Sequence, residues 1–97
     1  MKYLFILFAL MAQSALAQER VISAGGTLTE IIYALGKQNT LVAVDQSSMY
    51  PHQATQLPQV GYYRDLAAEG VLSMRPTTLL ALEGAGRSQA LKQIEAT

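Results

Sequence analysis

The chain has 97 residues, seven basic and seven acidic side chains, a formal net charge of zero and no cysteine. A neutral chain has no electrostatic attraction for nucleic acid or for an anionic membrane surface, so neither is expected as a partner. The absence of cysteine means that export of this chain would bring no disulfide bonds.

The N-terminus has the pattern of a secretory signal peptide. Lys2 is followed by a short apolar run and then by the small-x-small sequence Ala15-Leu16-Ala17. The apolar run is shorter than the roughly 20 residues that a membrane-spanning helix needs. We therefore expect residues 1–17 to be a signal peptide cleaved after Ala17, which leaves residues 18–97 as an exported chain. A buried core helix is the alternative interpretation of the same run.

Three short apolar segments predict strands. Residues 20–24 are rich in β-branched side chains and end at the pair Gly25-Gly26. Residues 41–44 are apolar throughout, as expected for a strand that is buried on both faces of a parallel sheet. Residues 78–82 form a third apolar segment, which follows the helix-stopping pair Arg75-Pro76.

Helical patterns alternate with these strands. Thr27 is expected to cap a helix, because Glu30 follows three residues later and completes a capping box, and Gly36 is expected to end it. The apolar face predicted for this helix consists of Leu28, Ile31, Ile32 and Leu35. Further helices are predicted over residues 67–74 and from Ser88 onwards. Strands alternating with helices predict an α/β fold with a parallel sheet and flanking helices.

In such sheets, ligands bind at the carboxyl ends of the strands. Three predicted loops lie there, and they hold the candidate cleft residues Gly25, Gly26, Gly84 and Arg87. The amides of Gly25-Gly26 open a helix and could hold an anion. Because the spacing fits neither a dinucleotide-binding fingerprint nor a Walker motif, a tight turn with a helix cap is the preferred interpretation.

The sequence contains no recognisable catalytic arrangement. His52 is the only histidine, so a tetrahedral zinc site would need three carboxylate ligands around it. No serine lies in a Gly-x-Ser-x-Gly elbow, and no pair of carboxylates has a useful spacing. We therefore expect no enzyme.

Tyr62 and Arg64 are the most informative pair. In an extended segment, residues two apart point the same way, so these side chains are expected to lie together while Tyr63 packs on the other face. A guanidinium beside a phenol favours the phenolate, which is a hard anionic ligand for ferric iron, and tyrosine is a known axial haem ligand. On spacing alone, two half-buried loop tyrosines and a solvated arginine are the preferred alternative.

The order of residues adds a family resemblance. The most specific segment, Val60 to Gly70, reads Val-Gly-Tyr-x-Arg-x-Leu-x-Ala-Glu-Gly. With other matching segments it resembles the N-terminal part of periplasmic substrate-binding proteins of the iron-compound and vitamin B12 class, and within it the haemin-binding proteins of bacterial haem ABC importers. The other segments are residues 20–23, 29–36, 42–45, 50–51, 57–59, 71–76 and 79–86.

The resemblance implies a periplasmic, monomeric, non-enzymatic protein that binds haem and delivers it to an inner-membrane ABC permease. It implies that Tyr62 is the axial ligand of the ferric haem iron and that Arg64 supports the phenolate. It also implies that Glu69 forms a salt bridge with an arginine of the permease, and that Arg87 reaches a haem propionate.

Length is where the chain departs from this family. Family members have two α/β lobes joined by a long helix, with the ligand between the lobes. Residues 18–97 correspond to the first lobe, so the sequence predicts an N-terminal fragment without the linking helix and second lobe. Alternatives are the same fold binding cobalamin or a ferric siderophore, a fragment that binds no ligand, and a small exported α/β enzyme.

Overall fold

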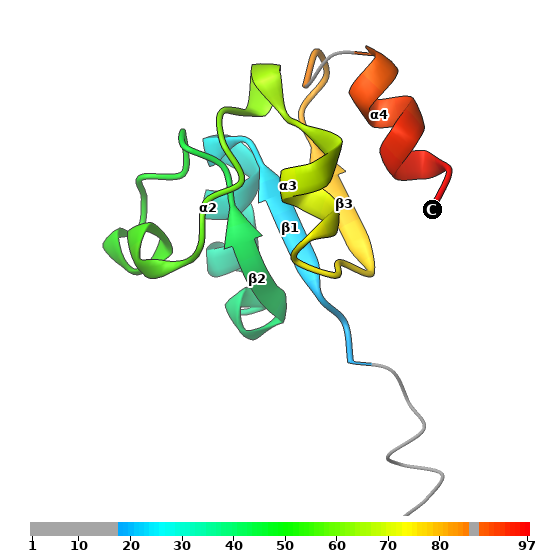
Figure 1. Ribbon diagram of the computed structural model, residues 1–97. Helices are drawn as coiled ribbons and strands as arrows, with labels where there is room; N and C mark the ends of the chain where they lie inside the picture. The colour runs from blue at the N-terminus through cyan, green and yellow to red at the C-terminus, as the bar shows by residue number, and fades with distance from the viewer. Residues whose placement is uncertain (1–17, 86–87) are drawn as a thin grey trace, which may run out of the picture.

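The computed structural model describes residues 18–85 and 88–97 (Figure 1). The predicted signal peptide lies outside the described residues and stays a prediction. No helix in the described part of the chain is long and apolar enough to cross a membrane. The elements, in order, are β1 (Val21–Ala24), α2 (Gly26–Ala34), the 3-10 helix η1 (Gln38–Thr40), β2 (Leu41–Val44), the 3-10 helices η2 (His52–Gln56) and η3 (Tyr63–Asp65), α3 (Ala68–Leu72), β3 (Thr78–Ala81) and α4 (Ser88–Glu95).

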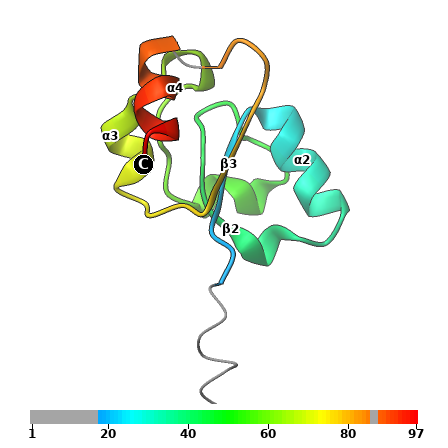
Figure 2. The same cartoon turned by 90° about the vertical axis from the view of Figure 1, so that its right-hand side faces the viewer.

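The three strands form one parallel sheet in the order β2-β1-β3. Helix α2 covers one face of this sheet, and α3 and α4 cover the other (Figure 2). The chain passes from β1 through α2 to β2 and then crosses over β1 to reach β3. The predicted α/β fold with a parallel sheet and flanking helices is therefore confirmed.

Each face of the sheet has its own apolar core, because successive side chains of a strand point to opposite faces. Ile22 and Ala24 of β1 join the core under α3 and α4, where Leu66 is also buried. Val21 belongs to the core under α2, together with Ile32. The strand at the centre of the sheet thus contributes to both cores.

The start of α2 differs from the prediction. The N-cap is Gly25, which makes no side-chain cap, and the helix begins at Gly26. The expected capping box of Thr27 and Glu30 is therefore wrong. The cap comes from another part of the chain, because Asp45 Oδ1 accepts from the Gly25 amide and Ser47 Oγ accepts from the Gly26 amide, at 3.0 and 2.9 Å.

The buried face of α2 also differs from the prediction. Ile32 is buried as expected, but Ile31 is 48% exposed and Leu35 is 69% exposed. Thr29 is fully buried instead, and its hydroxyl donates to Ser23 Oγ over 2.9 Å. A buried hydroxyl that keeps a hydrogen bond avoids the free-energy cost of an unpaired polar group. The helix can therefore turn Thr29 towards the sheet and leave Ile31 and Leu35 exposed.

The remaining helix boundaries are close to those expected. Gly36 has a φ of 70° directly after the α2 C-cap, which confirms its predicted role at the end of that helix. Helix α3 is shorter than the predicted 67–74, and the sequence did not predict η3 before it. Strand β3 ends at Ala81, one residue earlier than predicted, and α4 begins at Ser88 as predicted.

Gly25 is a position where only glycine fits. Its φ is 136°, and a Cβ atom there would overlap the Leu82 side chain. We predict that Gly25→Ala lowers the free energy of unfolding by about 1–3 kcal/mol. Gly70→Ala is the matched control, because it lies inside α3 with no heavy atom near an added Cβ, and it should stabilise by about 0.5–1 kcal/mol. Thermal unfolding followed by circular dichroism tests both, and equal midpoints would contradict the prediction.

Candidate functional site

The loops at the carboxyl ends of the strands meet as predicted. The amide of Asp45 donates to the carbonyl of Ser23, and the amide of Leu82 donates to the carbonyl of Ala24, at 3.0 and 3.1 Å. These bonds tie the loops after β2 and β3 to the end of β1. Gly25 lies against Leu82, so all three loops form one edge of the molecule.

The carboxylate of Asp45 lies at the centre of this edge and is fully buried. Its Oδ1 accepts from the Gly25 amide at 3.0 Å and from the Ser48 hydroxyl at 2.9 Å. Its Oδ2 accepts from the Tyr63 amide at 3.0 Å, and the Ser47 hydroxyl contacts both oxygens, at 3.0 and 2.8 Å. One carboxylate therefore joins the start of α2, its own turn and the tyrosine loop.

The sequence indicated only a polar turn over residues 45–48, and the role of Asp45 was missed. The signal available was an aspartate placed directly after a fully apolar strand and followed two and three residues later by serines. That pattern is typical of a side chain that bonds to its own turn. The long-range bonds to Gly25 and Tyr63 have no signature in the local sequence.

The tyrosine loop is held at both ends. Before it, residues 58–61 run beside β2, where the Val60 amide donates to the carbonyl of Val44 at 3.0 Å and the Gln46 amide donates to the carbonyl of Gly61 at 2.6 Å. After it, Leu66 is only 2% exposed and packs in the core under α3. The tyrosines thus lie between two anchored points.

Tyr62 is the outer member of an edge-to-face pair of rings. Its side chain is 43% exposed, and its ring meets that of Tyr63 edge to face, with centroids 4.9 Å apart and planes at 64°. Tyr63 is half-buried and packs against the core, as expected from the sequence. The exposed phenol therefore rests on a second ring that the fold itself supports.

Arg64 does not lie where the spacing predicted. Its Nε donates to the Tyr63 hydroxyl at 2.9 Å, and its guanidinium is 5.5 Å from the centroid of that ring. The expected pairing with Tyr62 fails because Tyr63–Asp65 forms η3, and the alternation of an extended strand does not apply to a 3-10 helix. The hydrogen bond to Tyr63, with charge attraction to Tyr63 and Tyr62, raises the pKa of Arg64 above its usual value.

The candidate cleft glycines have different surroundings. The amides of Gly25 and Gly26 bond to Asp45 and Ser47, so a tight turn with a cap, and no open anion site, is found there. Gly84 is exposed, with a φ of 83°, in the loop that follows β3. Arg87 lies outside the described residues. Within the described ranges, no group of three or more His, Cys, Asp or Glu side chains could hold a metal ion.

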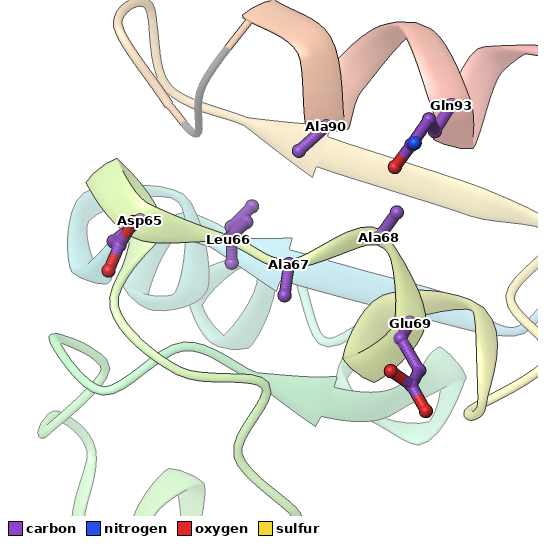
Figure 3. A pocket seen from close by; sticks show the side chains of 7 residues that line it. All are labelled: Asp65, Leu66, Ala67, Ala68, Glu69, Ala90 and Gln93. Carbon is purple, nitrogen blue, oxygen red and sulfur yellow. The ribbon is translucent and has the colours of Figure 1, made fainter.

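Glu69 is exposed in the first turn of α3. It lies on the rim of a shallow hollow of about 460 Å³ between the segment 65–69 and α4. Ala90 and Gln93 face this segment from α4 (Figure 3). The hollow thus adjoins the residue that the family resemblance associates with docking.

The chain is similar in sequence to known binding proteins. Over 91 residues it is 36% identical to a vitamin B12-binding protein of Yersinia pestis, a match that covers 94% of this chain and 32% of that protein. The chain thus spans about a third of the length of the curated relatives that it matches. No family model matches the chain.

Solved structures resemble this chain in both fold and sequence. The periplasmic haem-binding protein of Roseiflexus sp. RS-1 is 46% identical, with a TM-score of 0.79 over 82% of this chain and 31% of that one. A periplasmic haem-binding protein of Pseudomonas aeruginosa is 50% identical, with a TM-score of 0.78 over 80% and 28%. The periplasmic vitamin B12-binding protein of Vibrio cholerae is 33% identical, with a TM-score of 0.71 over 80% and 31%. These matches confirm the resemblance expected from the sequence.

The anchoring of the tyrosine loop by Leu66 leads to a stability prediction. Leu66→Ala removes a fully buried side chain and leaves a cavity, so it should lower the free energy of unfolding by about 2–5 kcal/mol. Leu35→Ala is the matched control, because Leu35 is largely exposed, and it should change stability by no more than about 0.5 kcal/mol. Urea unfolding measures both, and a similar midpoint for the two variants would show that Leu66 is not an anchor.

Proposed function

We propose, from its similarity to the periplasmic haem-binding and vitamin B12-binding proteins, that this chain is the iron-ligating lobe of a periplasmic substrate-binding protein for haem. In this proposal residues 18–97 form one lobe, and the tyrosine loop lines the ligand side of it. The protein binds its ligand without changing it chemically.

The position of Tyr62 carries the proposal. Its phenol is exposed at the edge of the sheet where parallel α/β folds bind ligands, and it rests on a ring that the core supports. A tyrosinate is an established axial ligand of ferric haem iron. The identities of 46% and 50% to two haem-binding proteins, against 33% and 36% to vitamin B12-binding proteins, support the same ligand.

Arg64 supports this ligand through the neighbouring ring. Its Nε donates to the Tyr63 hydroxyl, and its positive charge also attracts an anionic Tyr62. In this proposal Arg64, held beside Tyr63, supports the iron-bound Tyr62 oxygen by charge attraction.

Cobalamin is the second candidate ligand. The curated relatives that match this chain are vitamin B12-binding proteins, and a solved vitamin B12-binding protein has the same fold over most of the chain. For such a ligand, the exposed rings of Tyr62 and Tyr50 would supply contact surface and no iron–oxygen bond.

Delivery to an inner-membrane ABC permease completes the proposal. Glu69 is exposed on the first turn of α3, where a carboxylate is accessible to an arginine of another protein. The family resemblance supports this contact, a periplasmic location and a monomer.

A haemin titration tests the proposed ligand. We predict that the purified chain gives the Soret and charge-transfer bands of ferric haem bound by tyrosinate, and that Tyr62→Phe loses the charge-transfer band and weakens binding by about tenfold or more. Tyr33→Phe is the control, because this phenol lies on α2, on the opposite face of the sheet, and both signals should persist. Binding of cyanocobalamin without a Tyr62-dependent haem spectrum would support the second candidate instead.

The docking role of Glu69 has a separate test. In a bacterium whose haem importer lacks its own binding protein, we predict that Glu69→Gln lowers haem-dependent growth or uptake severalfold, because a charge pair to the permease is lost. Its haemin titration should stay unchanged. Glu30→Gln, at an exposed position of α2, is the control. Equal uptake by the two variants would argue against this docking contact.

A further inference from the structure

We infer that Asp45 is the positioning residue of the haem-ligating tyrosine, through the hydrogen bond between its Oδ2 and the Tyr63 amide. The inference rests on the proposed function, since it concerns how Tyr62 is presented to iron. Asp45 does not touch the ligand in this account.

The two carboxylate oxygens of Asp45 bond to different parts of the chain. Oδ1 accepts from Gly25 and Ser48, on the side of α2, whereas Oδ2 accepts from the Tyr63 amide. Both backbone donors are met by one side chain that is fully buried. Because buried side chains keep a single conformation, the carboxylate transfers the rigidity of the sheet and of α2 to the tyrosine loop.

The Tyr62 side chain takes its support from the residue that this bond holds. Its side chain is 43% exposed, and the ring contact described for it is the edge of the Tyr63 ring. A shift of the Tyr63 backbone therefore moves the Tyr63 ring, on which Tyr62 rests, and also the peptide bond that joins the two tyrosines. Outer partners that orient a metal ligand typically change metal affinity by about 10- to 100-fold when they are removed.

Replacing the Asp45 carboxylate by an amide separates the bond to Gly25 from the bond to Tyr63. Asn has one acceptor oxygen, so Asp45→Asn can serve Gly25 or Tyr63 but not both. Oδ1 has three donors around it, the Gly25 amide and the Ser48 and Ser47 hydroxyls. Oδ2 has two, the Tyr63 amide and the Ser47 hydroxyl, so the Asn carbonyl is best satisfied at the Oδ1 position. The Asn NH2 group then faces the Tyr63 N–H, and the tyrosine loop loses its acceptor.

The first experiment compares haemin titrations of the chain, Asp45→Asn, Tyr62→Phe and Ile32→Val. Ile32→Val loses stability in the core under α2, away from the tyrosine loop, and controls for destabilisation alone. We expect Asp45→Asn to weaken haemin binding by about tenfold and to shift or broaden the tyrosinate charge-transfer band. Ile32→Val should keep the band and the affinity of the unaltered chain.

A second pair of variants tests the same bond while Asp45 is kept. Tyr63→Ala and Tyr63→Pro both lose the ring, but only proline loses the N–H that donates to Oδ2. Tyr62, with φ −91° and ψ 139°, already has a backbone conformation that suits a residue before proline, and Tyr63 is the first residue of η3, where proline is tolerated. We expect Tyr63→Pro to bind haemin several times more weakly than Tyr63→Ala.

The outcomes are distinct. Loss of the band in Tyr62→Phe and its change in Asp45→Asn, with Tyr63→Pro weaker than Tyr63→Ala, supports the positioning role. Loss of the band in Tyr62→Phe alone, with the other variants within twofold of their controls, overturns the inference and leaves the proposed function standing. A band that persists in Tyr62→Phe overturns both. If Asp45→Asn does not fold, the comparison at Tyr63 decides.

Discussion

The fold and the candidate site depend on one buried carboxylate. Asp45 follows β2, accepts from the amide of Gly25, the N-cap of α2, and accepts from the tyrosine loop through the Tyr63 amide. Two backbone amides and the hydroxyls of Ser47 and Ser48 donate to its oxygens, so the carboxylate is buried with hydrogen-bond partners. The same group that ends a strand thus caps a helix and holds the loop that presents Tyr62.

The two faces of the sheet have separate functions. The face under α2 has a small core and a buried hydroxyl contact between Thr29 and Ser23, which fixes how the helix rotates against β1. The face under α3 and α4 buries Leu66 and supports Tyr63. The sheet between them thus carries Tyr63, and the exposed Tyr62 ring rests edge to face on that residue.

The sequence pointed to the tyrosine loop but missed Asp45 and the pairing of Arg64. The family resemblance indicated Tyr62 as a ligand, and the alternation of side chains indicated Tyr63 as a packing residue, which does pack against the core. The guanidinium of Arg64 was assigned to the wrong ring, because an extended segment was assumed where the chain forms η3. The support of Tyr62 by Arg64 stays a prediction.

The sequence by itself determined the strands, the end of α2 at Gly36 and the α/β class, because each follows from apolar runs, glycine and proline within a few residues. Only the tertiary structure decided the cap of α2 and its buried face, because the partners of Gly25 and Thr29 lie about 20 residues away, at Asp45 and Ser48. Local patterns assume that a helix supplies its own cap and buries its apolar side. In this fold the loop after β2 supplies a carboxylate that bonds to the N-cap of α2 and a hydroxyl that bonds to its buried threonine. The packing of the loops against one another places these groups next to the helix.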